Sequence, residues 1–197
     1  TWNIEKGFQT PNNVNQHVVV YDFGVTKNAL RILAMQGCRL TVVPANTSAD
    51  LVLAMNPQGI VLSDGPGNPA VYQDKIAIVK ALLESKKPIC GLGLGHQLIA
   101  LAIGSKTQKL NIGYYGVNHP VKVIANNNVV ITNQNYNYEI TESSLPSHAE
   151  ITHRSMFDQS VQGLQFNNQT VFSYQQTLEE AGAAKLLNEF IMSMQGK

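Results

Sequence analysis

The chain has 197 residues, of which 44% are hydrophobic and 14% are charged, with a formal net charge of +1. This length suits one domain with a sizeable core, and a second full domain is not expected. The near-zero net charge argues against nucleic acid or a membrane surface as a partner. No run of apolar residues approaches the 18 that a membrane-spanning helix needs.

The two cysteines, Cys38 and Cys90, each lie in or beside an apolar run that predicts a buried strand. Two isolated buried cysteines do not form a disulfide framework, and they suggest a reducing compartment. The polar N-terminus lacks the apolar core of a signal peptide. We therefore expect the protein in the cytoplasm.

The first half of the chain alternates apolar runs with helical patterns. Residues 1–16 are polar and rich in asparagine, so we expect a linker or N-terminal extension there and one domain over 17–197. Strands are expected at 17–23, 39–44, 59–64 and 88–92, helices at 26–37 and 71–85, and a short helical turn at 48–57. Continuous apolar strands separated by helices predict a parallel sheet that is covered on both faces.

The second half, from Lys106 onward, has a different pattern. Shorter β-like pieces are expected at 106–112, 119–124, 128–134, 150–155 and 164–175, and a last helix at about 179–194. The predicted fold class is therefore α/β: a doubly wound, mostly parallel sheet with helices on both faces and extra antiparallel strands in the C-terminal half.

A glycine-rich turn follows the strand at 88–92 and leads directly into a helical pattern. Three interpretations compete. A dinucleotide-binding loop would need a third glycine where the chain has His96, and it would follow the first strand rather than the fourth. The second interpretation is a glycine-rich connection between a strand and a helix that serves only packing. A nucleophile elbow, G-x-Nu-x-G, fits the spacing of Gly91, Gly93 and Gly95, with Gly93 at the nucleophile's position.

Motifs around this turn favour the elbow. The segment PICGLGLGHQLIALAIG (88–104) resembles the elbow of class I glutamine amidotransferases, whose pattern is G-x-C-x-G-H-Q, and SDGPGNP (63–69) resembles their oxyanion loop. The stretches at 116–121, 131–140 and 152–164 resemble the small subunit of carbamoyl-phosphate synthase in particular. The resemblance covers residues 17–197, corresponds to the C-terminal domain of that subunit, and implies the amidotransferase fold.

The resemblance also implies a reaction. In the family, the elbow cysteine attacks the side-chain amide of glutamine, a histidine moves the proton, and a glutamate orients the histidine. A thioester forms, water hydrolyses it, and the freed ammonia passes to the large subunit for carbamoyl phosphate, which feeds pyrimidine and arginine synthesis. Carried over by position, the cysteine corresponds to Gly93, the histidine to Thr177 and the glutamate to Glu179. Only the glutamate is retained.

The positions that hold glutamine in the family are better preserved. Gly65 and Leu94 correspond to the backbone N–H donors of the oxyanion hole. The remaining substrate positions implied by the resemblance are Gly67, Gln97, Asn135, Asn137 and Tyr138. Asn137 replaces a glycine and Tyr138 a phenylalanine. The same residues are also consistent with an inherited scaffold that no longer binds a ligand.

No other residue is expected to replace the family's nucleophilic cysteine and catalytic histidine. Cys90 lies inside a predicted strand, where a buried structural cysteine is the ordinary case. His96 matches a family residue that is not the catalytic base. None of the other histidines aligns with the position of that base.

We therefore expect a carbamoyl-phosphate synthase small-subunit-type domain that is inactive in glutamine hydrolysis and that pairs with the synthetase large subunit. No metal or cofactor is expected, and glutamine is the candidate ligand. One alternative is a glutamine-binding regulatory pseudoenzyme that acts as a binding module. Another is an active hydrolase with unconventional chemistry.

Overall fold

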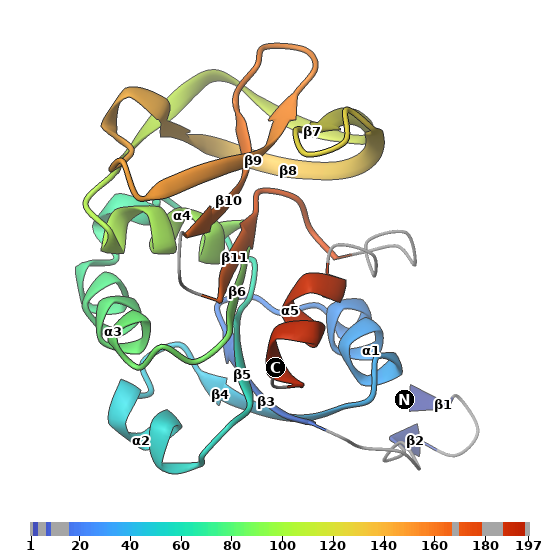
Figure 1. Ribbon diagram of the computed structural model, residues 1–197, viewed down its shortest axis with the longest axis vertical. Coiled ribbons are helices and arrows are strands. Elements are labelled where there is room, and N and C mark those ends of the chain that lie inside the picture. The colour runs from blue at the N-terminus through green and yellow to red at the C-terminus, as the bar shows by residue number, and fades with distance from the viewer. Residues whose placement is uncertain (1, 4–6, 9–15, 167–169, 179–186, 196–197) are drawn as a thin grey trace.

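The fold is built around one large mixed sheet. The computed structural model describes residues 2–3, 7–8, 16–166, 170–178 and 187–195. Figure 1 shows the central sheet nearly edge-on, with helices on both sides of it and a layer formed by β7, β8 and β9 above. The order of the strands in this sheet is β4-β3-β5-β6-β11-β10-β9-β7-β8.

Neighbouring strands in one half of the sheet are parallel. These strands are β3 (Gln16–Asp22), β4 (Cys38–Pro44), β5 (Gly59–Leu62), β6 (Ile89–Leu92) and β11 (Val171–Tyr174). The other half is antiparallel and consists of β7 (Lys106–Val123), β8 (Val129–Thr141), β9 (Ala149–Ser155) and β10 (Val161–Phe166). The carboxyl ends of the parallel strands therefore lie beside the antiparallel layer.

Helices cover both faces of the parallel half, as Figure 1 shows. One face carries α1 (Lys27–Met35) and α5 (Leu187–Met194), and the other carries α2 (Ala49–Ala54), α3 (Gln73–Glu84) and α4 (Leu94–Ala102). Two single-turn 3₁₀ helices, η1 (Pro69–Val71) and η2 (Glu142–Ser144), lie in connecting loops.

Strand β3 shows why the sheet needs two helical layers. Val18 and Val20 pack into the core cluster with α1 and α5, whereas Val19 and Tyr21 pack into the cluster with α2, α3 and α4. Successive side chains of a strand point to opposite faces, so an uninterrupted apolar run must be covered on both. All four side chains are completely buried.

The predicted fold class is confirmed, and the differences are local. The expected pieces at 106–112 and 119–124 are wrong as separate strands, because both belong to β7, which pairs with β8 as one long hairpin. Register shifts in this pairing lie between Lys109 and Tyr114 and between Gly116 and His119, which interrupts the alternation that marks a strand. Within the expected linker, β1 (Trp2–Asn3) pairs with β2 (Gly7–Phe8). Residues 179–186 of the expected last helix lie outside the described residues.

Among the described residues, no helix combines the length and the apolar character that crossing a bilayer requires.

Close packing of α4 on β5 leads to a first prediction. A Cβ atom added at Gly95 would lie 2.2 Å from the backbone oxygen of Leu62, which cannot move without disturbing β5. We expect Gly95→Ala to lower the free energy of unfolding by about 1–3 kcal/mol or more, because extra atoms in a packed core force backbone shifts. Urea denaturation measures the change.

Gly116→Ala is the matched control. No heavy atom lies within 4 Å of the Cβ that this substitution adds. It should therefore change the free energy of unfolding by no more than about 0.5 kcal/mol. Equal effects of the two substitutions would show that α4 does not depend on this close approach.

Candidate functional site

A sharp turn connects β6 to α4 at the carboxyl end of the parallel sheet. Gly93 forms the turn with φ +49° and ψ −109°, a conformation that residues with a side chain rarely adopt. Its N–H donates to the carbonyl of Tyr174 at the end of β11 (2.9 Å). The geometry matches a nucleophile elbow: a strained turn that presents its central residue at the edge of the sheet.

The carboxylate of Asp64 lies directly over this turn. Asp64 follows β5, and its Oδ1 accepts hydrogen bonds from the backbone N–H groups of Gly65 (2.8 Å) and Leu94 (3.0 Å). A Cβ atom added at Gly93 would lie only 1.9 Å from the same oxygen. The Asp64 side chain therefore occupies the space where a nucleophile's side chain would begin. It is hydrogen-bonded to the two N–H groups that the family resemblance assigns to the oxyanion hole.

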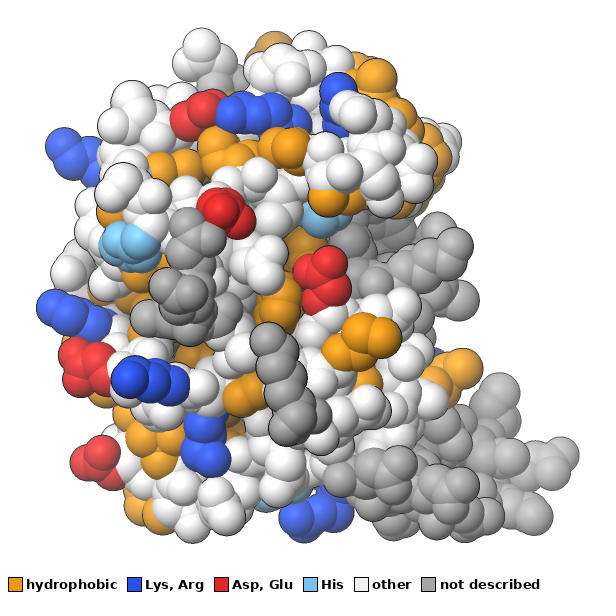
Figure 2. Space-filling model, in the orientation of Figure 1, with side chains coloured by type: hydrophobic (Ala, Val, Ile, Leu, Met, Phe, Trp, Pro, Cys, Tyr) orange, Lys and Arg blue, Asp and Glu red, His pale blue; other side chains and the backbone are white. Residues whose placement is uncertain are grey.

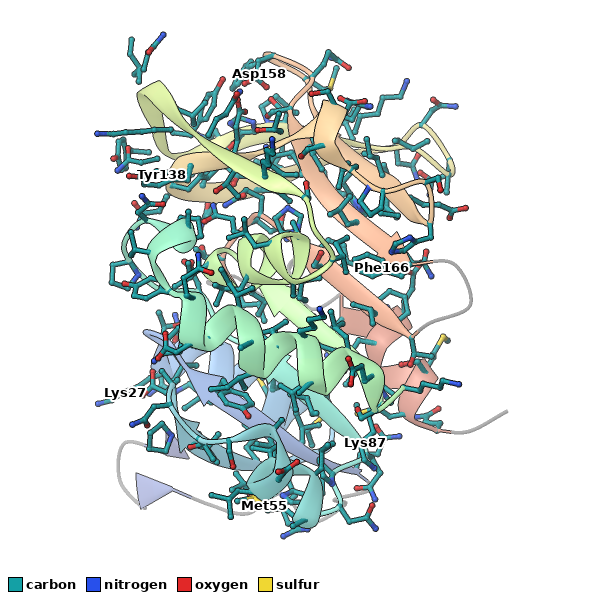
Figure 3. All side chains as sticks on the ribbon, turned by 90° about the vertical axis from the view of Figure 1, so that its left-hand side faces the viewer. Lys27, Met55, Lys87, Tyr138, Asp158 and Phe166 are labelled. Carbon is teal, nitrogen blue, oxygen red and sulfur yellow. The ribbon has the colours of Figure 1, made fainter. Side chains whose placement is uncertain are left out.

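A polar cavity of about 430 Å³ opens beside Asp64. It lies between the loops that follow β3 and β5, the start of α4, the strand β8 and the segment after β11. Its lining consists of Gly24, Thr26, Asp64, Gly65, Pro66, Gly67, Asn68, Leu94, Gln97, Tyr115, Asn135, Tyr136, Asn137, Tyr138, Gln175 and Thr177. In Figure 3, Tyr138 on β8 lies on the left-hand edge of the view, above Lys27, which follows the lining residue Thr26.

Two buried glutamines connect α4 to the far wall of this cavity. The amide nitrogen of Gln97 donates to the carbonyl of Tyr138 (2.6 Å) and to Oε1 of Gln175 (3.2 Å). Gln175 is 2% exposed, and its own amide nitrogen has no hydrogen-bond partner among the described residues. A buried donor without a partner is costly, and Gln175 is also one of the residues that line the cavity.

Asn137 replaces a family glycine without backbone strain. It is not among the described residues with positive φ, and its Oδ1 accepts a hydrogen bond from the hydroxyl of Tyr115 on the neighbouring strand β7. Its side chain is therefore held at the rim of the cavity by Tyr115.

The structure brings most of the residues inferred from the sequence to one place. The cavity is lined by Gly65, Gly67, Leu94, Gln97, Asn135, Asn137, Tyr138 and Thr177. Gly93 is not a lining residue but lies against Asp64, which is one. Glu179 lies outside the described residues. Asp64 and Gln175 also line the cavity but were not among the site residues inferred from the sequence. The only sequence signal for Asp64 is that it directly precedes the glycine of the oxyanion loop, in the segment that follows β5.

The cysteine and histidines nearest to the elbow lie behind it and not in the cavity. Cys90 is fully buried in β6, and desolvation raises the pKa of its thiol to about 12. His96 is fully buried in α4, with its Nδ1 bonded to the hydroxyl of Ser173 (2.8 Å). Burial, with a smaller contribution from His153, lowers the pKa of His96 to about 3. Neither residue can serve as a thiolate or as a base near neutral pH.

Charged side chains of both signs share the molecular face shown in Figure 2, where basic and acidic residues are interspersed. Within the described ranges, no cluster of three or more histidine, cysteine or carboxylate side chains could hold a metal ion.

Comparisons with known proteins agree with this geometry. A family model described as glutamine amidotransferase class-I matches residues 19–191. The chain is 49% identical to the carbamoyl phosphate synthase small chain of Pasteurella multocida (strain Pm70) over 197 residues, which covers 98% of this chain and 51% of that protein. It is 52% identical to the carbamoyl phosphate synthase small chain of Neisseria meningitidis serogroup B (strain ATCC BAA-335 / MC58) over 174 residues, which covers 88% of this chain and 46% of that protein. The chain thus spans about half the length of these relatives.

Solved structures support the fold. A GMP synthase-like protein from Thermoplasma acidophilum superimposes with a TM-score of 0.79 at 23% identity, over 91% of this chain and 94% of that one. A glutamine amidotransferase from Thermotoga maritima superimposes with a TM-score of 0.66 at 14% identity, over 94% and 84%. At these identities the likeness establishes the architecture alone.

The histidines behind the elbow predict a loss of stability in acid. His153 packs edge-on against Tyr174, and burial lowers its pKa to about 4. The unfolded chain protonates its histidines below about pH 6.5, whereas folded His96 and His153 stay neutral, so stability falls as the pH drops from 6.5 toward 4. Each histidine should cost about 2 kcal/mol between pH 7 and pH 5.

Urea denaturation of variants at pH 7 and pH 5 measures this predicted loss of stability. His96→Gln should reduce the loss of stability between pH 7 and pH 5 by about 2 kcal/mol, whereas Gly116→Ala, which removes no titratable group, should leave that loss unaltered. A wild-type-like pH dependence in His96→Gln would mean that His96 takes up its proton in the folded protein.

Proposed function

The chain belongs to the class I glutamine amidotransferase family, and on that premise we propose that it is the glutaminase-type domain of a carbamoyl-phosphate synthase small subunit and that it does not hydrolyse glutamine. Identities of 49% and 52% to carbamoyl phosphate synthase small chains support the assignment within the family. The proposed role is to bind the synthetase large subunit, which then uses free ammonia.

The observation that carries the inactivity is the glycine at the elbow. Gly93 has the backbone geometry of a nucleophile but no side chain to form a covalent bond. In a serine protease triad, loss of the nucleophile lowers turnover roughly 10⁶-fold. A comparable loss is expected when a thiolate is missing, because the thioester route then has no first step.

The proposed base position supports the same conclusion. Thr177 lines the cavity, where the family places its histidine, but a threonine hydroxyl does not take up a proton near neutral pH. Cys90 cannot take over, since its thiol has no exposed surface and an upward-shifted pKa. Cys38 is also buried, so no accessible thiol is available for an active hydrolase with unconventional chemistry among the described residues.

A second candidate function is favoured by the retained cavity. Gln97, Asn135 and Tyr138 still line a space of about 430 Å³ next to Asp64. A glutamine-binding regulatory module, independent of carbamoyl phosphate, would use the same residues. Association with a synthetase large subunit separates the two candidates, because only the first requires it.

Ammonia release tests the proposed inactivity. The protein, alone and mixed with the carbamoyl-phosphate synthase large subunit of the same organism, should release no ammonia from glutamine above background. The mixture should form carbamoyl phosphate from free ammonia but not from glutamine, and the two proteins should co-elute in size-exclusion chromatography.

Cys90→Ser serves as the control in this assay. Glutamine turnover at the rate of an ordinary amidotransferase would contradict the proposal, and its loss in Cys90→Ser would identify Cys90 as the nucleophile. Failure of the two proteins to associate, together with measurable glutamine binding, would favour the regulatory module.

A further inference from the structure

We propose that Asp64 is a specificity-determining residue of this pocket: its carboxylate occupies the oxyanion hole and excludes ligands that end in a carbonyl oxygen. The inference rests on the proposed function, because it takes the N–H groups of Gly65 and Leu94 as the oxyanion donors of an amidotransferase site. The inference goes beyond the proposed inactivity, because it concerns the Asp64 carboxylate that fills the oxyanion hole and not the missing nucleophile at Gly93.

The hydrogen bonds show how the carboxylate is held. Both N–H groups converge on one oxygen, Oδ1, at 2.8 and 3.0 Å. Hydrogen bonds to an ionised acceptor are about twice as strong as neutral ones. Leu94 is also the first residue of α4, and the positive end of a helix dipole favours an anion at this point.

The backbone around Asp64 fixes the reach of its side chain. The hydroxyl of Ser63 donates to the carbonyl of Asp64 (2.8 Å) and accepts from the N–H of Phe23 (3.0 Å), which ties the loop after β5 to the loop after β3. Gly65 packs so closely on this loop that an added Cβ would lie 2.3 Å from the backbone oxygen of Phe23. The carboxylate is therefore presented to the N–H groups by a constrained loop.

Gly93 provides the space that the carboxylate fills. Any side chain at position 93 would place its Cβ 1.9 Å from Oδ1 of Asp64, well inside contact distance. In this side-chain conformation the carboxylate and a nucleophile's side chain exclude each other, so a larger residue at position 93 requires the Asp64 side chain to rotate away from the two N–H groups. The glycine at the elbow and the aspartate over it form one coupled arrangement.

This arrangement changes which ligand the pocket accepts. An empty oxyanion hole offers two donors to a carbonyl oxygen, whereas the occupied hole presents a carboxylate, which repels that oxygen. The side-chain amide of glutamine and the carboxylate of glutamate must therefore displace Asp64. An amino acid of similar length whose side chain has no terminal carbonyl need not displace Asp64 to enter the cavity.

Ligand discrimination tests the inference. Calorimetry would compare glutamine with norvaline, which has an unbranched side chain without the terminal amide, in wild-type protein, Asp64→Ala and Asp64→Asn. In Asp64→Ala, the preference for glutamine over norvaline should rise at least about tenfold, because two donors become available to the amide oxygen. Asp64→Asn should change less, since its carbonyl oxygen can still accept both hydrogen bonds.

The amide resonances of Gly65 and Leu94 give a readout that needs no ligand. Both should shift strongly in Asp64→Ala and hardly at all in Asp50→Ala, a surface change in the first turn of α2. If Asp64→Ala does not fold, Asp64→Ser, whose shorter side chain cannot span both donors, takes its place.

Two outcomes would overturn the inference. One is that Asp64→Ala has the same preference between glutamine and norvaline as the wild-type protein. A variant that binds neither ligand counts as this outcome too. The other is unshifted resonances of Gly65 and Leu94. Both measurements are independent of ammonia release and of large-subunit association, so they can fail while the proposed function holds.

Discussion

The Asp64 carboxylate lies in the space above the first turn of α4 that a side chain at position 93 would enter, and this competition is the constraint on which the account of the site depends. Parallel strands bring the ends of β5 and β6 together, and α4 packs so closely on β5 that Gly95 has no room for a Cβ. The two N–H groups at this point need an acceptor. In this chain the acceptor is the carboxylate of Asp64, and it fits because residue 93 is a glycine.

The same constraint bears on the proposed inactivity, because it shows how the turn can be stable with a glycine at its centre. A nucleophile elbow stores backbone strain, of order 1–3 kcal/mol, when its central residue has a side chain. Gly93 adopts the turn without that strain, and the Asp64 carboxylate satisfies the donors that a reaction intermediate would otherwise satisfy. The cavity is retained, and a role in binding, to a ligand or to a partner subunit, is what this arrangement supports.

The sequence predicts the parallel sheet and the elbow well, because both depend on local signals. Apolar runs such as 17–23 mark strands that are buried on both faces, and the spacing of Gly91, Gly93 and Gly95 marks the turn. The long hairpin of β7 and β8 is less predictable, since register shifts interrupt its alternation. The position of the Asp64 carboxylate depends on two loops and a helix that meet only in the folded protein. An aspartate before Gly-Pro-Gly looks like an ordinary turn residue in the sequence.

Reconstruction of the reaction centre tests the central claim most directly. Ammonia release from glutamine would be measured for Gly93→Cys/Thr177→His and for the same protein with Asp64→Ala added. If Asp64 and a side chain at position 93 compete for one space, the triple variant should recover measurable hydrolysis and the double variant much less, because in the double variant the Asp64 carboxylate must first leave the oxyanion donors. Equal hydrolysis by the two variants, or none by a folded triple variant, would contradict the account.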